Sequence, residues 1–217
     1  MAPTRRTKRL LLLSVLGAAA LGLPAVPAVR QSALQAAGHW LVSDDPLAAA
    51  DAVIVAVDAR GAGVLEAADL VAAGLAPRVA VFGEPPLRSD VELARRGLPG
   101  YDDASIAIGQ LRTLGVATAE RVGVPVQGTE DEGATLALWC AAHGIRTAIL
   151  VSNADHTRRT RRIMARATAG SAVRILVRAS RYSDFDPDRW WRSRLGLRTG
   201  IVELQKLLFD LLRHPVA

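Results

Sequence analysis

The stretch Ala52-Val53-Ile54-Val55-Ala56-Val57 decides the fold. Its six successive apolar residues are rich in β-branched side chains, and they show none of the polar alternation of a strand with one wet face. Four more short runs of this kind follow along the chain, at residues 78–82, 121–126, 147–151 and 173–177. The sequence therefore predicts five strands that are buried on both faces.

Longer helical patterns separate these runs, as the crossovers between parallel strands require. They lie at residues 65–73, 90–96, 104–114, 130–143 and 156–168, with one more helix at each end, at residues 31–41 and 200–213. We predict a three-layer α/β/α sandwich around an open, mostly parallel, Rossmann-like sheet, preceded by an N-terminal signal or anchor helix.

Open sheets of this kind bind ligands beyond the carboxyl ends of their strands, where loops and helix N-termini meet. Topology thus selects the residues that follow each predicted strand. They are residues 58–60, 83–84, 127–132 and 152–159. From these segments we predict the ligand-binding residues Asp58, Gly83, Thr129, Ser152, Asn153 and Arg159 and the catalytic residues His156 and Glu132.

The densest of these segments is Ser152 to Arg159, a polar loop that runs into a basic helix. His156 can act as acid, base or hydrogen-bond donor, and Arg159 follows one helical turn later on the same face, so that both can address one anion. The alternative is structural: Asp155 caps the helix, the arginines are solvated and His156 packs against the sheet.

Thr129 and Glu132 also have two interpretations. A threonine followed three residues later by a glutamate is a capping box, which needs no ligand. The other interpretation places both residues in the crevice.

The C-terminal region combines the pair Trp190-Trp191 with Arg192, Arg194 and Arg198. Such a cluster can meet a membrane surface, but the Trp pair is more simply explained by packing under the last helix. In that helix, Glu203 and Lys206 lie one turn apart and can be an ordinary surface pair.

The N-terminus carries an export signal. Four basic residues precede an apolar run at residues 10–23, and small residues at 25–28 offer a cleavage site. The run is also about long enough to anchor the chain in a bilayer. We predict a signal peptide or transmembrane anchor at residues 1–29, a connecting segment at 30–49 and the α/β domain at 50–217. The domain is then extracytoplasmic, on the plasma membrane or secreted.

The net charge of +6 gives little support for nucleic-acid binding. Four of the basic residues belong to the N-terminal segment, and the rest of the chain is nearly balanced. Basic residues gather from Ala154 to Arg213, where 14 basic residues stand against 6 acidic ones. Aromatic residues are not interleaved with the arginines of the predicted helix at 156–168, as they often are in nucleic-acid-binding proteins. This region is a solvated basic face, or it attracts phosphate, lipid headgroups or an acidic partner.

No motif for familiar chemistry is present. Gly61-Ala62-Gly63 lacks the spacing of a phosphate-binding glycine loop, and no Cys or His cluster forms a metal site. The one cysteine, Cys140, sits in an apolar helical stretch and is predicted to be a buried thiol. We therefore predict no metal, and the cofactor stays open.

Several segments together, from Ala50 to the C-terminus, resemble the YdcF/SanA/ElyC-like family of bacterial envelope proteins. The resemblance rests on the opening strand with the helix after it, on the order of later motifs and on the Trp pair with Glu203-x-x-Lys206. These later motifs are Val126-Gln127-Gly128-Thr129-Glu130-Asp131-Glu132, Ile149-Leu150-Val151-Ser152 and His156-Thr157-Arg158-Arg159.

The resemblance implies that Thr129, Glu132, Ser152, His156 and Arg159 line a cleft. It also implies a role in envelope integrity, peptidoglycan assembly or its lipid carrier. The chain departs from the family where Val57-Asp58-Ala59-Arg60 replaces a glycine-rich loop and Val64 replaces a common arginine. Both changes alter how the cleft meets an anion.

The expected function is therefore that of an envelope protein that binds an anionic, phosphate-containing ligand, such as a lipid-linked wall precursor. If it turns its ligand over, His156 is the acid or base, Arg159 stabilises negative charge and Glu132 orients. The alternatives are a non-enzymatic membrane-surface scaffold, or a nucleotide or S-adenosylmethionine binder of the YdcF type.

Overall fold

Five parallel strands form a single sheet in the computed structural model, which describes residues 26–215. The strands are β1 (Ala52–Val55), β2 (Val79–Val81), β3 (Ala119–Arg121), β4 (Thr147–Ser152) and β5 (Arg174–Ala179). Their order across the sheet is β3-β2-β1-β4-β5, and all four pairings are parallel. The predicted α/β class is confirmed, with an all-parallel sheet of the Rossmann-like kind.

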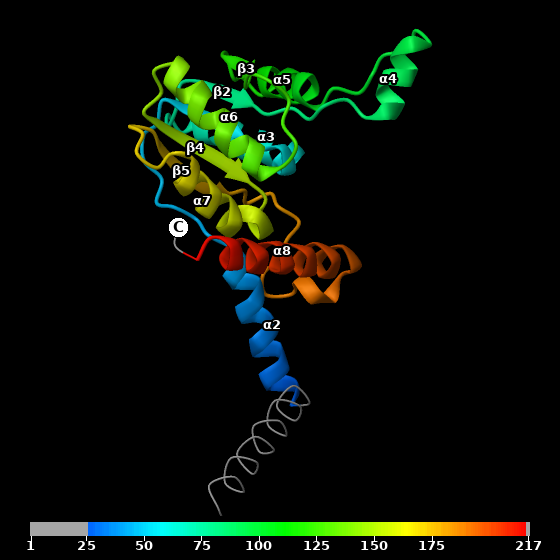
Figure 1. The fold of residues 1–217 in the computed structure, drawn as a ribbon, viewed down its shortest axis with the longest axis vertical. Coiled ribbons are helices and arrows are strands. Elements are labelled where there is room, and N and C mark those ends of the chain that lie inside the picture. Colours follow the sequence, from blue (N-terminus) through cyan, green and yellow to red (C-terminus); the bar gives the residue numbers. More distant parts are fainter. Residues whose placement is uncertain (1–25, 216–217) are drawn as a thin grey trace, which may run out of the picture.

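Helices cover both faces of this sheet (Figure 1). In chain order they are α2 (Pro27–Leu41), α3 (Arg60–Ala72), α4 (Arg88–Arg95), α5 (Asp103–Thr113), α6 (Thr129–Ala142), α7 (Thr157–Ala167) and α8 (Arg194–Arg213). Helix α3 contacts α5 on one face, and α6 contacts α7 on the other. The chain changes face after β3, so the strand order reverses between β1 and β4.

The central strands are buried on both faces, as their composition requires. Every residue of β1 and β2 is buried, and so are five of the six residues of β4. These strands form the main hydrophobic core with the inner faces of α3, α5 and α6. Cys140 belongs to this core, as predicted, and burial raises the pKa of its thiol to about 11.

The third strand differs from its prediction. We expected it at residues 121–126, but β3 is Ala119–Arg121, so only Arg121 is shared. Gly123 has a φ of 39°, and Pro125 has no N–H to give to a ladder, so the regular strand ends before them. Val122 and Val126 are still buried, but they follow the sheet edge as irregular chain. Their apolar character therefore predicted burial correctly and strand structure wrongly.

A second, smaller hydrophobic cluster joins both ends of the described chain. Leu41 of α2 packs there with Trp190 and Leu207, and Leu34 of α2 lies beside them. The packing interpretation of the Trp pair is therefore confirmed: Trp190 is buried, and Trp191 meets it edge to face at 6.2 Å between ring centroids. The segment predicted as a connector is thus part of a core.

A helix projects from the molecule at each of two opposite ends. Helix α2 projects from the side on which α8 lies, and α4 stands out at the opposite end, with none of its residues buried (Figure 1). None of the helices within residues 26–215 is both long and apolar enough to span a bilayer. The predicted signal or anchor falls almost wholly outside the described residues.

Candidate functional site

A cavity of about 730 Å³ opens at the carboxyl ends of β1 and β4, where the strand order reverses. This is the position at which open α/β sheets bind ligands. Three chain segments surround it: the turn after β1 with the start of α3, the turn after β4, and the loop after β5 with the start of α8. The lining polar residues are Asp58, Arg60, Asn153, Asp155, His156, Tyr182, Ser183, Asp184, Ser193, Arg198 and Thr199.

Asp58 ties the two strand ends together. It lies in the short 3-10 turn η2 (Val57–Ala59), and its carboxylate accepts hydrogen bonds from the Ser152 hydroxyl at 2.9 Å and the Asn153 backbone N–H at 2.8 Å. The Asn153 side chain in turn donates to the Asp58 carbonyl at 2.7 Å. Three predicted site residues therefore form one unit; Asp58 and Asn153 line the cavity, and Ser152 is buried behind them.

His156 is held between two carboxylates. It ends the 3-10 turn η3 (Ala154–His156), with Nε2 at 3.4 Å from Asp155 Oδ2 and Nδ1 at 3.3 Å from Glu203 Oε2. Burial lowers the pKa of His156, but the hydrogen bond to Glu203 and the charges of Asp58 and Asp155 outweigh burial and leave the pKa raised. The imidazole of His156 is therefore more basic than that of an exposed histidine. Since the residue before α7 is His156 itself, Asp155 is not the helix cap, and that alternative is wrong.

Glu203 is the site residue that sequence reasoning misassigned. It is 1% exposed, and it accepts hydrogen bonds from Arg159 Nε at 2.9 Å and Lys206 Nζ at 2.6 Å. Burial raises the pKa of this carboxyl, but His156, Arg159 and Lys206 together bring it down to about 2. The surface-pair interpretation of Glu203 and Lys206 is wrong, because the carboxylate organises the inner wall of the site.

Arg159 is one turn from His156, as expected, but its guanidinium is turned to Glu203. Its Nη2 lies 3.4 Å from His156 Nδ1, and the side chain does not line the cavity. The positive charge of Arg159 is therefore largely balanced by the buried carboxylate of Glu203. Arg60 and Arg198 are the arginines that the cavity offers to a ligand.

Glu132 reaches across to the turn after β1. Its Oε1 accepts the Val57 N–H at 2.8 Å, and Gly128, with a φ of 86°, is the residue before α6. The capping box is therefore not formed. Burial, then the charge of Asp58, raises the pKa of Glu132 to about 7. Glu132 thus holds the backbone of the turn after β1 through Val57, and it does not line the cavity.

The remaining two predicted residues lie away from the cavity. Thr129 starts α6 and is half-buried. Gly83 follows β2 and packs so closely that a Cβ there would come within 2.8 Å of Arg121 Nη1. Gly83 makes room for packing and for the hydrogen bond from the Val126 N–H to its carbonyl.

The loop after β5 and the start of α8 were missed altogether. Tyr182 to Phe185 and Ser193 to Thr199 close one side of the cavity. The loop could have been found, because it follows the carboxyl end of a predicted strand. The start of α8 carries no such signal, because it follows no strand and reaches the cavity only through the packing of distant parts of the chain.

One group of metal-type ligands occurs within residues 26–215: Glu130, Asp210 and His214, whose ligand atoms lie within 4.8 Å of one another. Arg166 Nη2 already pairs with Glu130 at 3.1 Å and Asp210 at 2.7 Å, and Arg162 Nε with Asp210 at 2.6 Å. A cation would have to displace both guanidinium groups. These residues are accounted for as ion pairs.

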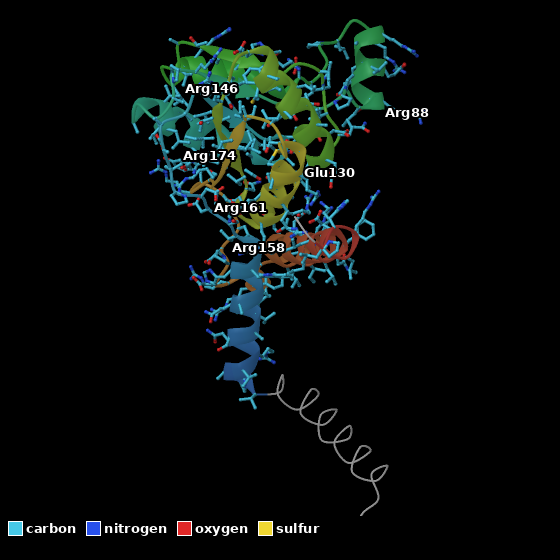
Figure 2. All side chains as sticks on the ribbon, turned by 60° about the vertical axis from the view of Figure 1, so that its left-hand side comes forward. Arg88, Glu130, Arg146, Arg158, Arg161 and Arg174 are labelled. Atoms are coloured by element: carbon cyan, nitrogen blue, oxygen red, sulfur yellow. The ribbon has the colours of Figure 1, made fainter. Side chains whose placement is uncertain are left out.

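Several arginines at the surface lie on different elements of the molecule. Figure 2 shows Arg88 on α4, Arg146 and Arg174 on the body, and Arg158 and Arg161 beside the domain end of α2. The guanidinium of Arg158 is bound by the carbonyls of Trp40 and Val42. Much of the basic character of the C-terminal third is therefore used inside the fold.

The described residues form an α/β fold with a cavity at the point where the strand order of its sheet reverses. No protein-family model matches the chain, and no curated protein matches it either.

Proposed function

We propose that the protein is a cell-envelope protein of the YdcF/SanA/ElyC-like kind that binds an anionic, phosphate-containing ligand in this crevice. A ligand of peptidoglycan or lipid-carrier metabolism has the required chemistry. The family resemblance and the N-terminal segment support the envelope assignment, and the lining of the cavity supports the ligand class.

The observation that carries the proposal is the backbone of Arg60. This residue has a φ of 43° and a ψ of −134°, which makes it the one non-glycine residue with positive φ among the described residues. Such a conformation costs about 1–3 kcal/mol, and strain of this kind concentrates at functional sites. Here it places Arg60 on the cavity wall at the start of α3.

The start of α3 is itself suited to an anion. No side chain caps this end, and its first turn contains no acidic residue. The positive end of the helix dipole therefore adds to the charges of Arg60 and Arg198, which line the same cavity. A phosphate group is the natural occupant of this part of the cavity.

The cavity also has acidic lining residues, which suit hydroxyl groups. Asp58, Asp155 and Asp184 line it. Carboxylates accept hydrogen bonds from sugar or alcohol hydroxyls but repel a second phosphate. The lining thus fits a phosphorylated sugar or alcohol better than a polyphosphate.

Turnover at this site would depend on His156. Its raised pKa favours the imidazolium, which can donate a proton to a leaving group. Glu203 orients the ring in the role that we expected of Glu132, and Arg159 holds Glu203.

A calorimetric titration with geranyl phosphate and with glucose 1-phosphate tests the ligand class. We expect saturable binding of at least one probe and a loss of about tenfold or more in affinity for Arg60→Gly. The same variant relieves the positive φ, so its free energy of unfolding should be no lower than that of the unmodified protein. Arg88→Ala on α4 is the matched control and should bind normally. Absence of saturable binding for both probes, or normal binding by Arg60→Gly, would contradict the proposal.

The envelope assignment has a separate test. A reporter that is active only outside the cytoplasm, fused after the last residue, should be active and should cofractionate with membranes or the extracytoplasmic fraction. An inactive reporter would place the domain in the cytoplasm and overturn the assignment.

A further inference from the structure

Helix α8 buries two carboxylates beside its inward residue Leu207, and it leaves several large apolar side chains exposed on its outward face. Its inward face contains Glu203 at 1% exposure and Asp210 at 6%. Its outward face contains Leu208, Phe209 and Leu212 at 54%, 64% and 75%. A helix at the surface of a globular domain normally does the reverse.

The inward charges are explained by α7. Arg159 binds Glu203, while Arg162 and Arg166 bind Asp210, all at 2.6–2.9 Å. The contact between the two helices is therefore a row of buried ion pairs. These ion pairs fix the rotation of α8 about its own axis, with Leu208 and Leu212 facing outward.

The outward apolar face extends along the whole helix. Its members share more than a third of their surface with solvent: Leu195, Leu197, Ile201, Val202, Leu208, Phe209 and Leu212. A continuous exposed apolar face of this kind marks an interaction site. Arg192 and Arg194 stand beside its N-terminal members, and no carboxylate of residues 26–215 pairs with either of them.

The charges select the partner. The α8 face of a second copy offers these arginines no exposed carboxylate, because its two acidic residues, Glu203 and Asp210, are buried against α7. An anionic bilayer surface neutralises the arginines and takes up the apolar side chains, as it does with other interfacial helices.

The course of the chain supports the same partner. The uncharged apolar run at residues 10–23 precedes α2, and α2 packs against α8. The described chain thus begins at the end of the molecule where α8 lies (Figure 1).

We propose that the outward face of α8 docks on an anionic bilayer surface, with Leu208, Phe209 and Leu212 entering the interface. This role does not depend on what the crevice binds.

A single-cysteine label tests the docking in the full chain. Cys140 is buried and its thiol pKa is about 11, so it stays unreactive, and Phe209→Cys can be labelled selectively with an environment-sensitive fluorophore. Leu138→Cys is the matched control, because Leu138 is 74% exposed on α6. Both variants are reconstituted into vesicles of phosphatidylglycerol and phosphatidylcholine.

We expect the label at position 209 to shift to the blue and to be quenched by spin-labelled lipid, and the label at 138 to do neither. The shift should weaken in vesicles of phosphatidylcholine alone. Two results would overturn the proposal: a label at 209 that stays in water, or a blue shift that appears without lipid and grows with protein concentration. The second result would identify another copy as the partner.

Discussion

At the scale of single residues, the site depends on one carboxylate that never reaches the cavity. Glu203 binds the imidazole of His156 and the guanidinium of Arg159 at once. The protonation state of the residue most suited to chemistry is therefore set by a residue on α8, 47 positions further along the chain.

Replacing Glu203 by glutamine should lower the pKa of His156. The neutral amide can still orient the ring, but it no longer stabilises the imidazolium, so the effect of burial becomes dominant. A proton NMR titration of the histidine ring signals measures this shift. Glu92→Gln on α4 is the control and should leave the titration unchanged; an unaltered His156 pKa in Glu203→Gln would contradict the assignment.

Glu132 should make the fold less stable as pH rises. Its carboxyl has a pKa of about 7 in the folded protein against 4.5 when exposed, so between these values the unfolded chain ionises first. The penalty is absent below pH 4.5 and complete above pH 7, where it is of the order of 3 kcal/mol.

Glu132→Gln should therefore be more stable than the unmodified protein at pH 8 and similar to it at pH 4. Glutamine keeps an oxygen for the Val57 N–H, so the hydrogen bond survives. Urea unfolding at the two pH values measures the difference. Glu130→Gln, an exposed neighbour in the same helical turn, should show no such gain, and a gain of equal size at both pH values would refute the mechanism.

At the scale of helices and strands, α8 can lie where it does because two of its residues have no side chain. A Cβ at Gly200 would come within 2.4 Å of Trp190 Cε3, and one at Gly196 within 2.3 Å of the Trp190 carbonyl. On the facing helix, a Cβ at Gly38 would meet the same indole at 2.7 Å. Trp190 thus fills a slot between α2 and α8.

Gly200→Ala should destabilise the protein by about 1–3 kcal/mol, because the added methyl group overpacks this slot. Gly109→Ala on α5 is the matched control: a Cβ there would meet nothing within 4 Å, and alanine favours a helix by about 0.5–1 kcal/mol. Thermal unfolding should therefore shift in opposite directions for the two variants. A stable Gly200→Ala protein would show that α8 is not tightly packed on Trp190.

The sequence predicted most helices and strands, and it predicted the contacts at the edge of the sheet but not those between α7 and α8. The positions of β1 and β4 follow from their apolar runs, and so the sequence alone could place Asp58, Asn153 and His156 at one edge of the sheet. Glu203 could not be placed there, because its burial depends on how α8 rotates against α7. No local period encodes that rotation, because α8 has leucines on both its buried side and its exposed side.

At the scale of the whole molecule, α2 belongs to the domain over only half of its length. Leu34, Ala37 and Leu41 pack into the second cluster, whereas residues 26–33 are exposed. Trp190 Nε1 also donates to the Leu34 carbonyl at 2.7 Å.

A chain that starts at Gln31 should therefore be as stable as one that starts at Val26. A chain that starts at Val42 should lose about 2–5 kcal/mol, since the cluster loses Leu34 and Leu41. Urea unfolding of the three chains, followed by tryptophan fluorescence, measures both effects. Equal stability of all three would show that α2 is not part of the folded unit.

The indole between the three glycines also has a mechanical consequence. Because Trp190 fills its slot on both sides, α2 cannot roll or bend against α8 at that point without a steric clash. The C-terminal half of α2 is therefore fixed to the rest of the domain. A tilt of this half of α2 is therefore passed on to α8, whose first turn lines the crevice.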